Sequence, residues 1–107
     1  MPSYKLRVST EALRSGSTLD GAYHDLGTPF EHPIRIVKIT NSSTADATIS
    51  FHGGSQDDEF VPAGSFLLLD LNANKDSDCD YVFPVGTQVS YKGSGIGTIY
   101  LSSYFVT

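Results

Sequence analysis

Apolar and polar positions alternate along much of the chain and predict short β-strands. The clearest case runs from Ala47 to Phe51, where Ala47, Ile49 and Phe51 share one side. Phe66 to Leu71 is the longest apolar run, and we expect it to form a fully buried strand. Further strands are expected over residues 4–9, 34–40, 60–61, 81–83, 87–92 and 98–106. About eight short strands with turn signals between them are typical of a two-sheet β-sandwich.

Two corners in the sequence share the pattern apolar-apolar-Pro-x-Gly-hydroxyl, at residues 60–65 and 82–87. Pro62 suits the second position of a type I turn, and Gly64 suits the fourth. We interpret both as one kind of corner used at equivalent places in two sheets. The predicted fold is therefore all-β, a jelly-roll-like antiparallel sandwich that forms a single domain over residues 1–107. An immunoglobulin-type sandwich is the alternative, although the chain has no Trp and no cysteine pair.

The expected core is built from the inward-facing side chains of these strands. They are Leu6, Val8, Ile36, Ile49, Phe51, Leu67, Leu69, Val89, Ile99 and Leu101. On the last strand the core side also includes Phe105, whereas Tyr100 and Tyr104 share the opposite face. Two tyrosines on an outer face are suited to stacking on sugars or to burial against another subunit.

The first 33 residues are expected to contain an N-terminal strand followed by a long, ordered arm. Residues 10–14 have the composition of a single capped helical turn. The connection after them is rich in Ser, Gly, Thr and Pro and carries Tyr23, Leu26 and Phe30. Apolar groups on such an arm need to be covered, either by its own sandwich or by another protein.

Six side chains are therefore candidates for partner contacts, namely Tyr4, Tyr23, Leu26, Phe30, Tyr100 and Tyr104. Three basic residues of the N-terminal segment, Lys5, Arg7 and Arg14, are expected to meet acidic groups between residues 57 and 80 of a neighbouring copy.

The chain is acidic, with 12 Asp and Glu against 7 Lys and Arg and a net charge of −5. The acid is concentrated in residues 41–107, which carry eight acidic and two basic groups. Such a surface repels phosphate, so we expect no nucleic-acid or membrane partner. No apolar run has signal-peptide or membrane-spanning length, which indicates synthesis in the cytoplasm. Cys79 is the only cysteine, so no internal disulfide is expected.

One acidic loop resembles the start of a calcium loop, with Asp76, Asp78 and Asp80 at alternate positions. A calcium loop of that kind also needs a Gly at its sixth position and a Glu at its twelfth, where this chain has Tyr81 and Thr87. A solvated acidic loop is the favoured interpretation, and a looser Ca²⁺ site on the three aspartates is the alternative. We expect no cofactor.

No catalytic motif is present. Three consecutive acids, residues 57–59, lie in a predicted loop without a visible partner, and His24, His32 and His52 have no metal-ligand spacing. No nucleophile elbow accompanies the serines, and nothing in the sequence activates Cys79. The sequence therefore predicts a protein that is not an enzyme, and it assigns no role to the three histidines or to the cysteine.

The order of turns and strand endings over residues 34–107 resembles that of small jelly-roll virion proteins of tailed bacteriophages. The resemblance rests on four successive segments, ITNSSTADATISFHGG, FVPAGSFLLLDLNANK, FPVGTQVSYKG and GTIYLSSYF. It implies a structural protein of the virion, made in the host cytoplasm. The most specific expectation is a capsid decoration or cementing protein that binds capsid or other virion proteins. It also implies a homo-oligomer, a dimer or a trimer.

Three other functions are open from the sequence. The first is a head–tail connector or fibre-attachment protein. The second is a carbohydrate-binding module that uses loop aromatics and an aspartate-bound Ca²⁺. The third, a cupin-like enzyme, lacks the required His cluster.

Overall fold

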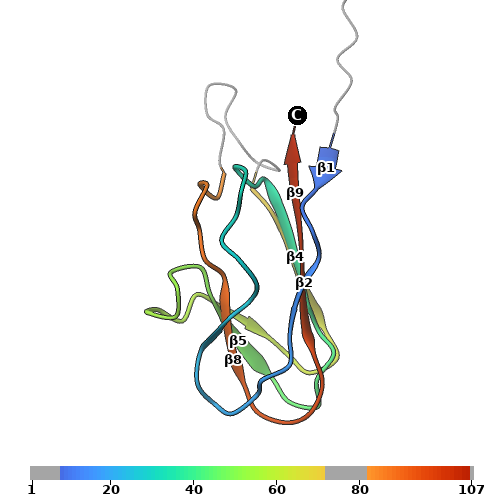
Figure 1. Ribbon diagram of the computed structural model, residues 1–107. Coiled ribbons are helices and arrows are strands. Elements are labelled where there is room, and N and C mark those ends of the chain that lie inside the picture. Colours follow the sequence, from blue (N-terminus) through green and yellow to red (C-terminus); the bar gives the residue numbers. More distant parts are fainter. Residues whose placement is uncertain (1–7, 72–81, 107) are drawn as a thin grey trace, which may run out of the picture.

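The computed structural model describes residues 8–71 and 82–106 (Figure 1). Within those ranges the chain forms nine strands and no helix, so the helical turn predicted over residues 10–14 is wrong. The strands are β1 Val8–Thr10, β2 Arg14–Gly16, β3 His24–Asp25, β4 Ile36–Asn41, β5 Ala47–Ser50, β6 Glu59–Val61, β7 Phe66–Asp70, β8 Ser90–Gly93 and β9 Ile99–Val106. They build two antiparallel sheets that face each other as a sandwich (Figure 1).

The strand order is that of a jelly roll. One sheet has the order β1-β9-β4-β7, with β2 also paired to β9, and the other has the order β3-β8-β5-β6. Because β1 and β2 pair with successive parts of β9, they form one interrupted edge strand and occupy a single position. The first strand thus pairs with the last, and the chain crosses repeatedly between sheets, as in a double-sheet jelly roll. The predicted fold class is confirmed.

The core lies between the two sheets. Its buried apolar side chains are Leu26, Phe30, Ile34, Val37, Ile39, Ala47, Ile49, Val61, Val89, Tyr91, Ile99 and Leu101. Four of the predicted core residues are in this set, and Phe51 and Leu67 pack against it while partly exposed. The side chains of Leu6 and Val8 lie outside the described part of the structure.

The faces of β4 differ from the prediction. Val37 and Ile39 fill the core, whereas Ile36 is only half-buried. Ile36 is paired with Asp70 and Tyr104, which place it in a row on the outer face of the sheet. Leu69 lies on the core side but is also half-buried, because its strand stands at the margin of the sheet.

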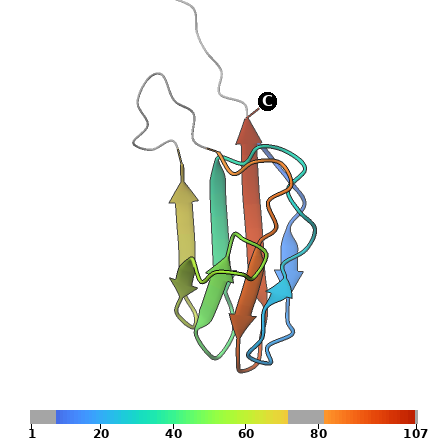
Figure 2. The same cartoon turned by 90° about the vertical axis from the view of Figure 1, so that its left-hand side faces the viewer.

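Strand β7 is an edge strand and not the fully buried strand that its apolar run predicts. Among the described strands it pairs with β4 alone, and Figure 2 shows it at the left margin of its sheet. Exposure alternates along it, with Phe66 61% exposed and Leu68 55% exposed. The uninterrupted run therefore covers one core-facing and one solvent-facing side of the same strand.

The two proline–glycine corners have the same geometry. Ser65 N donates to Pro62 O at 3.0 Å, and Thr87 N donates to Pro84 O at 3.1 Å. Each prolyl residue is therefore the first residue of its turn, and the third residue is a glycine with positive φ, 73° in the first corner and 90° in the second. These are type II turns, not the predicted type I. The first carries the chain from β6 in one sheet to β7 in the other, and the second follows the isolated bridge between Ile34 and Phe83.

The connection from β2 to β4 runs along the open edge of β8. Strand β3 pairs with β8, and two further backbone bonds follow, from Leu26 N to Val89 O at 2.8 Å and from Phe30 N to Thr87 O at 3.0 Å. The arm thus completes the four-stranded sheet and directs two large side chains into the core.

Candidate functional site

The outer face of the five-stranded sheet gathers several of the residues singled out in the sequence. Tyr100 is paired with Thr40, which is paired on its other side with Phe66, so the three side chains form one row across β9, β4 and β7. Tyr104 lies four residues further along β9 on the same face. Tyr100 is 37% exposed, whereas Tyr104 is half-buried. The structure thus places both tyrosines opposite the core face of β9.

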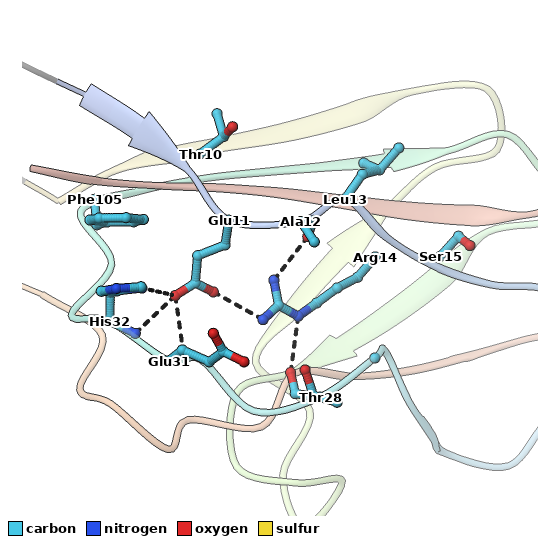
Figure 3. Close-up of a pocket in the computed structure, with 11 residues that line it drawn as sticks. Thr10, Glu11, Ala12, Leu13, Arg14, Ser15, Thr28, Glu31, His32 and Phe105 are labelled. Carbon is cyan, nitrogen blue, oxygen red and sulfur yellow. Dashed lines mark hydrogen bonds and ion pairs between the residues drawn. The ribbon is translucent and has the colours of Figure 1, made fainter.

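Four large apolar side chains are exposed on this face, and we call them the outer-face patch: Leu13, Phe66, Leu68 and Tyr100. Leu13 is 63% exposed and points away from the inward-facing Arg14 (Figure 3). Lys38 lies in the row of Leu68 and holds its Nζ 5.1 Å from the centre of the Phe66 ring. Exposed apolar side chains that gather on one face mark an interaction surface more often than an inert one.

Leu26 and Phe30 are not available to a partner. Both are buried in the core, and Phe30 also contacts the Phe83 ring, at 6.2 Å between centroids. The expectation that these two side chains contact another protein is therefore corrected, because the arm uses them to close its own sandwich. Tyr23 remains partly exposed.

Tyr23 is held by the loop between β5 and β6. Its hydroxyl donates to the Asp57 carboxylate, and Lys92 Nζ lies 4.7 Å from its ring centre and 3.2 Å from the same carboxylate. Burial and the hydrogen bond to Asp57 raise the pKa of the Tyr23 hydroxyl well above its usual value. Gly54, with φ of 92°, brings the loop backbone so close that a Cβ there would lie 3.0 Å from Tyr23. The contacts among Tyr23, Asp57 and Lys92 therefore brace the loop.

The adjacent Asp58 braces the other side of the same loop. Its carboxylate accepts hydrogen bonds from Phe51 N at 2.7 Å, from His52 Nδ1 at 2.8 Å and from Gln56 Nε2 at 2.8 Å. Burial would raise the pKa of Asp58, but these hydrogen bonds outweigh it and hold the pKa below the usual value. Both acids therefore have structural partners: Asp57 bonds to Tyr23 and Lys92 outside the loop, and Asp58 bonds to residues within it.

Several candidates lie outside the described residues: Tyr4, Lys5, Arg7, Asp76, Asp78, Cys79 and Asp80. In the described ranges, no three His, Cys, Asp or Glu residues are placed to hold a metal ion. The same ranges contain no helix long and apolar enough to cross a membrane.

A cleft of about 560 Å³ opens between the β1–β2 segment and the arm, and a polar cluster lies at its base (Figure 3). Glu11 is at its centre, with only 5% of its side chain exposed. One carboxylate oxygen of Glu11 accepts from Arg14 Nη2 at 2.9 Å. The other accepts from the backbone N of Glu31 at 3.1 Å and from His32, through its backbone N at 2.8 Å and its Nδ1 at 3.0 Å.

The guanidinium of Arg14 is equally engaged. Besides Glu11, its hydrogen-bond acceptors are the carbonyl oxygens of Ala12, Thr28 and Pro29 and the hydroxyl of Ser103. Its carbon Cζ lies 5.4 Å from the centre of the Phe30 ring. The expectation that Arg14 meets an acidic neighbour is corrected, since its partner is Glu11 of the same chain.

These contacts make the cluster a structural staple. Burial would raise the pKa of Glu11, but the hydrogen bonds from His32 and Arg14 outweigh it and hold that pKa below its usual value. A carboxylate that stays ionised and accepts four hydrogen bonds is poorly suited to proton transfer. His32 in turn stacks on Phe105, with centroids 3.8 Å apart and planes 6° apart. The cluster ties the β1–β2 segment, the arm and β9 together.

Sequence reasoning missed this cluster. The sequence predicts a helical turn that contains Glu11 and Arg14, and it assigns no role to His32. On a helix, two residues three apart can form an ion pair. In the structure, Glu11 instead lies between β1 and β2 and Arg14 begins β2, and this extended segment brings their side chains together. The contact with His32 spans 21 residues and leaves no local signal.

Comparisons of the chain with protein-family models, with curated proteins and with solved structures found no match.

Proposed function

We propose that this protein is a non-enzymatic structural protein of a tailed-phage virion, a capsid decoration or cementing protein that binds the shell. The observation that carries the proposal is the outer-face patch, in which four large apolar side chains stand exposed on one sheet. The resemblance of residues 34–107 to jelly-roll virion proteins supplies the identity of the partner.

The chemistry of the patch supports a protein partner. Burying apolar surface contributes roughly 25 cal/mol per Å² removed from water, and Tyr and Phe are enriched in interface cores. Lys38 is the one cation that the described strands of this sheet direct to its outer face, and it already lies over the Phe66 ring. A flat face of apolar groups around one cation suits a protein surface better than a phosphate-rich one.

The polar clusters support a role without catalysis. Glu11, Arg14 and Asp58 have their hydrogen-bonding capacity used by the fold itself. In the cleft, the Glu11 carboxylate and the Arg14 guanidinium are therefore engaged in contacts within the chain.

A co-sedimentation assay tests the proposal. Shells are prepared from the phage whose genome encodes this chain, with the gene deleted, and are incubated with the purified protein. The wild-type protein is expected to pellet with the shells. Variants Leu13→Ser and Tyr100→Ser, which alter the outer-face patch at β2 and β9, are expected to remain in the supernatant.

Ile96→Ser is the matched control, because Ile96 is 82% exposed but lies in the hairpin between β8 and β9 and is not one of the four patch residues. It is expected to pellet as the wild type does. Equal pelleting of all variants, or none by the wild type, would contradict the proposal. Binding to a glycan array that Tyr100→Ser abolishes would support the carbohydrate-binding alternative instead.

A further inference from the structure

Strand β7 presents an open sheet edge. It pairs with β4 over five residues without a bulge, and no described strand pairs with its other side (Figure 2). Such an edge is a template for pairing with another strand, because its outer row of backbone groups has no partner within the sheet.

The hydrogen-bond pattern shows which backbone groups face outward. Asn41 N donates to Ser65 O at 2.9 Å, and Leu71 N donates to Arg35 O at 2.9 Å, so the odd-numbered residues at both ends of the strand bond to the β4 side. Because the pattern alternates in an antiparallel ladder, Phe66 and Leu68 direct their N–H and C=O groups to the open edge. The same two residues expose their side chains on the outer face.

Within the described residues, strand β7 has few of the devices that prevent pairing, and Asp70 is its one charged side chain. Proteins protect an open edge with Lys, Pro, a bulge or a very short strand. Strand β7 has the sequence FLLLD, contains no Lys or Pro, and keeps a continuous register with β4. An exposed, regular and apolar edge is stable in solution only when something covers it.

We propose that the β7 edge binds the β7 edge of a second copy of this chain, in antiparallel orientation, with a two-fold axis at Leu68. Leu68 of each copy exchanges both backbone bonds with Leu68 of the other, and Phe66 lies opposite Asp70. The two five-stranded sheets then form one continuous sheet whose apolar outer faces lie on the same side. A strand edge that pairs with itself about a two-fold axis gives a closed dimer.

Charge selects this register. It brings Asp70 of one copy beside Phe66 of the other, where Lys38 Nζ of that other copy lies 5.1 Å from the ring centre. The carboxylate, which also has a partner within its own chain, and the ammonium thus lie on the same face once on each side of the axis. A shift that places the two Asp70 side chains opposite each other would oppose like charges.

Sedimentation measurements on three substitutions at Leu68 test the pairing. Leu68→Pro removes only an N–H that faces the open edge, so the bonds to β4 remain and the protein is expected to fold but to have the mass of a monomer. Leu68→Lys places two ammonium groups opposite each other and is expected to give a monomer too. Leu68→Thr keeps the N–H and is expected to remain a dimer with a larger dissociation constant.

Leu13→Lys is the control for a different dimer. Leu13 belongs to the outer-face patch but lies next to β2, at the opposite margin of the sheet. The Leu13→Lys variant is expected to keep the mass of a dimer if the copies join at β7. It is expected to have the mass of a monomer if the copies stack face to face. A monomeric wild type, or a dimer that both Leu68→Pro and Leu68→Lys leave intact, would overturn the proposal.

Cysteine cross-linking tests the register, in a Cys79→Ser background. Opposed residues in a hydrogen-bonded pair have Cα atoms about 5.5 Å apart, within the range of roughly 4.4–6.8 Å that a disulfide spans. Leu68→Cys is expected to form a covalent dimer under mild oxidation. Phe66→Cys and Asp70→Cys are each expected to stay uncrosslinked alone and to cross-link when mixed, and the reverse outcome would refute this register.

The inference does not depend on the virion role. A dimer that does not pellet with shells would leave the pairing intact and contradict the proposed function. A monomer that pellets with shells would contradict the pairing at β7 and support the proposed function.

Discussion

At the scale of single residues, a buried ion pair between Glu11 and Arg14 constrains the β1–β2 segment. Their side chains are 5% and 7% exposed, and every charged oxygen or nitrogen of the pair has a partner. Removing two charges from water is costly, so such a pair adds little net stability, but losing one member leaves the other uncompensated. The pair therefore fixes the β1–β2 segment against the arm.

Glu11→Gln is expected to lower the free energy of unfolding by about 3–5 kcal/mol, because it leaves the buried Arg14 charge without its counter-ion. Urea unfolding at neutral pH measures the loss. Glu31→Gln is the control, since Glu31 is exposed and neighbours the same cluster, and it is expected to change stability by less than about 0.5 kcal/mol. A loss below about 1 kcal/mol for Glu11→Gln would show that the pair is not effectively buried.

The same carboxylate gives a pH dependence. The pKa of Glu11 is lower in the folded protein than its usual value of 4.5, so the unfolded chain binds more protons in acid. Its contribution is therefore fully present above a pH of about 4.5 and is lost as the pH falls through the folded pKa. The stability difference between wild type and Glu11→Gln is expected to shrink over that interval in urea titrations at stepped pH. If the difference stays constant into acid, the stability lost in Glu11→Gln comes from packing and not from the charge of Glu11.

At the scale of the elements, the arm between β2 and β4 is part of the core. Phe30→Ala removes a buried ring and is expected to cost about 3–5 kcal/mol in unfolding free energy. Leu13→Ala also shortens an apolar side chain in the first third of the chain but at an exposed position, so it is expected to cost less than about 0.5 kcal/mol. Equal costs for the two would show that the arm does not pack as described. Removing residues 1–30 would therefore disrupt folding before it tested binding.

The sequence predicts an element well when the residues that cause it are close together in the chain. Alternation located most of the strands, because it is a property of neighbouring residues, and it separated Tyr100 from Leu101 correctly. It could not place β7 at an edge, because strand order is set by pairings between distant segments. Strand β3 has only two residues and is held by backbone bonds to β8, so it leaves no pattern to detect.

The candidate site divides in the same way. The tyrosines of β9 were predictable on the outer face, whereas Phe66 and Leu68 were assigned to the interior by their apolar run. The error matters for function, because the exposed half of that run supplies two members of the outer-face patch and the open edge of the sheet. A run of apolar residues in a short strand is equally compatible with burial on both sides and with an apolar exposed face.

At the scale of the whole molecule, the two proposals have a joint consequence. In the β7-paired dimer both outer-face patches point to the same side, so one dimer can engage two equivalent sites on a repetitive shell. Linked binding of two sites strengthens the overall affinity by roughly 10²–10⁴-fold when the geometry allows both to engage. The monomeric Leu68→Pro variant is therefore expected to bind assembled shells more weakly than the wild type by a factor of that order.

The comparison that isolates this effect uses isolated capsid subunits in place of shells. A single subunit offers one site, so the monomeric variant and the wild type are expected to bind it with similar affinity, apart from the contact that Leu68 itself makes. Leu68→Thr, which alters the same side chain but keeps the dimer, corrects for that contact. If Leu68→Pro and Leu68→Thr bind shells equally well, the two patches of a dimer do not act together. That result would count against joint binding even if the wild type forms the dimer and binds shells.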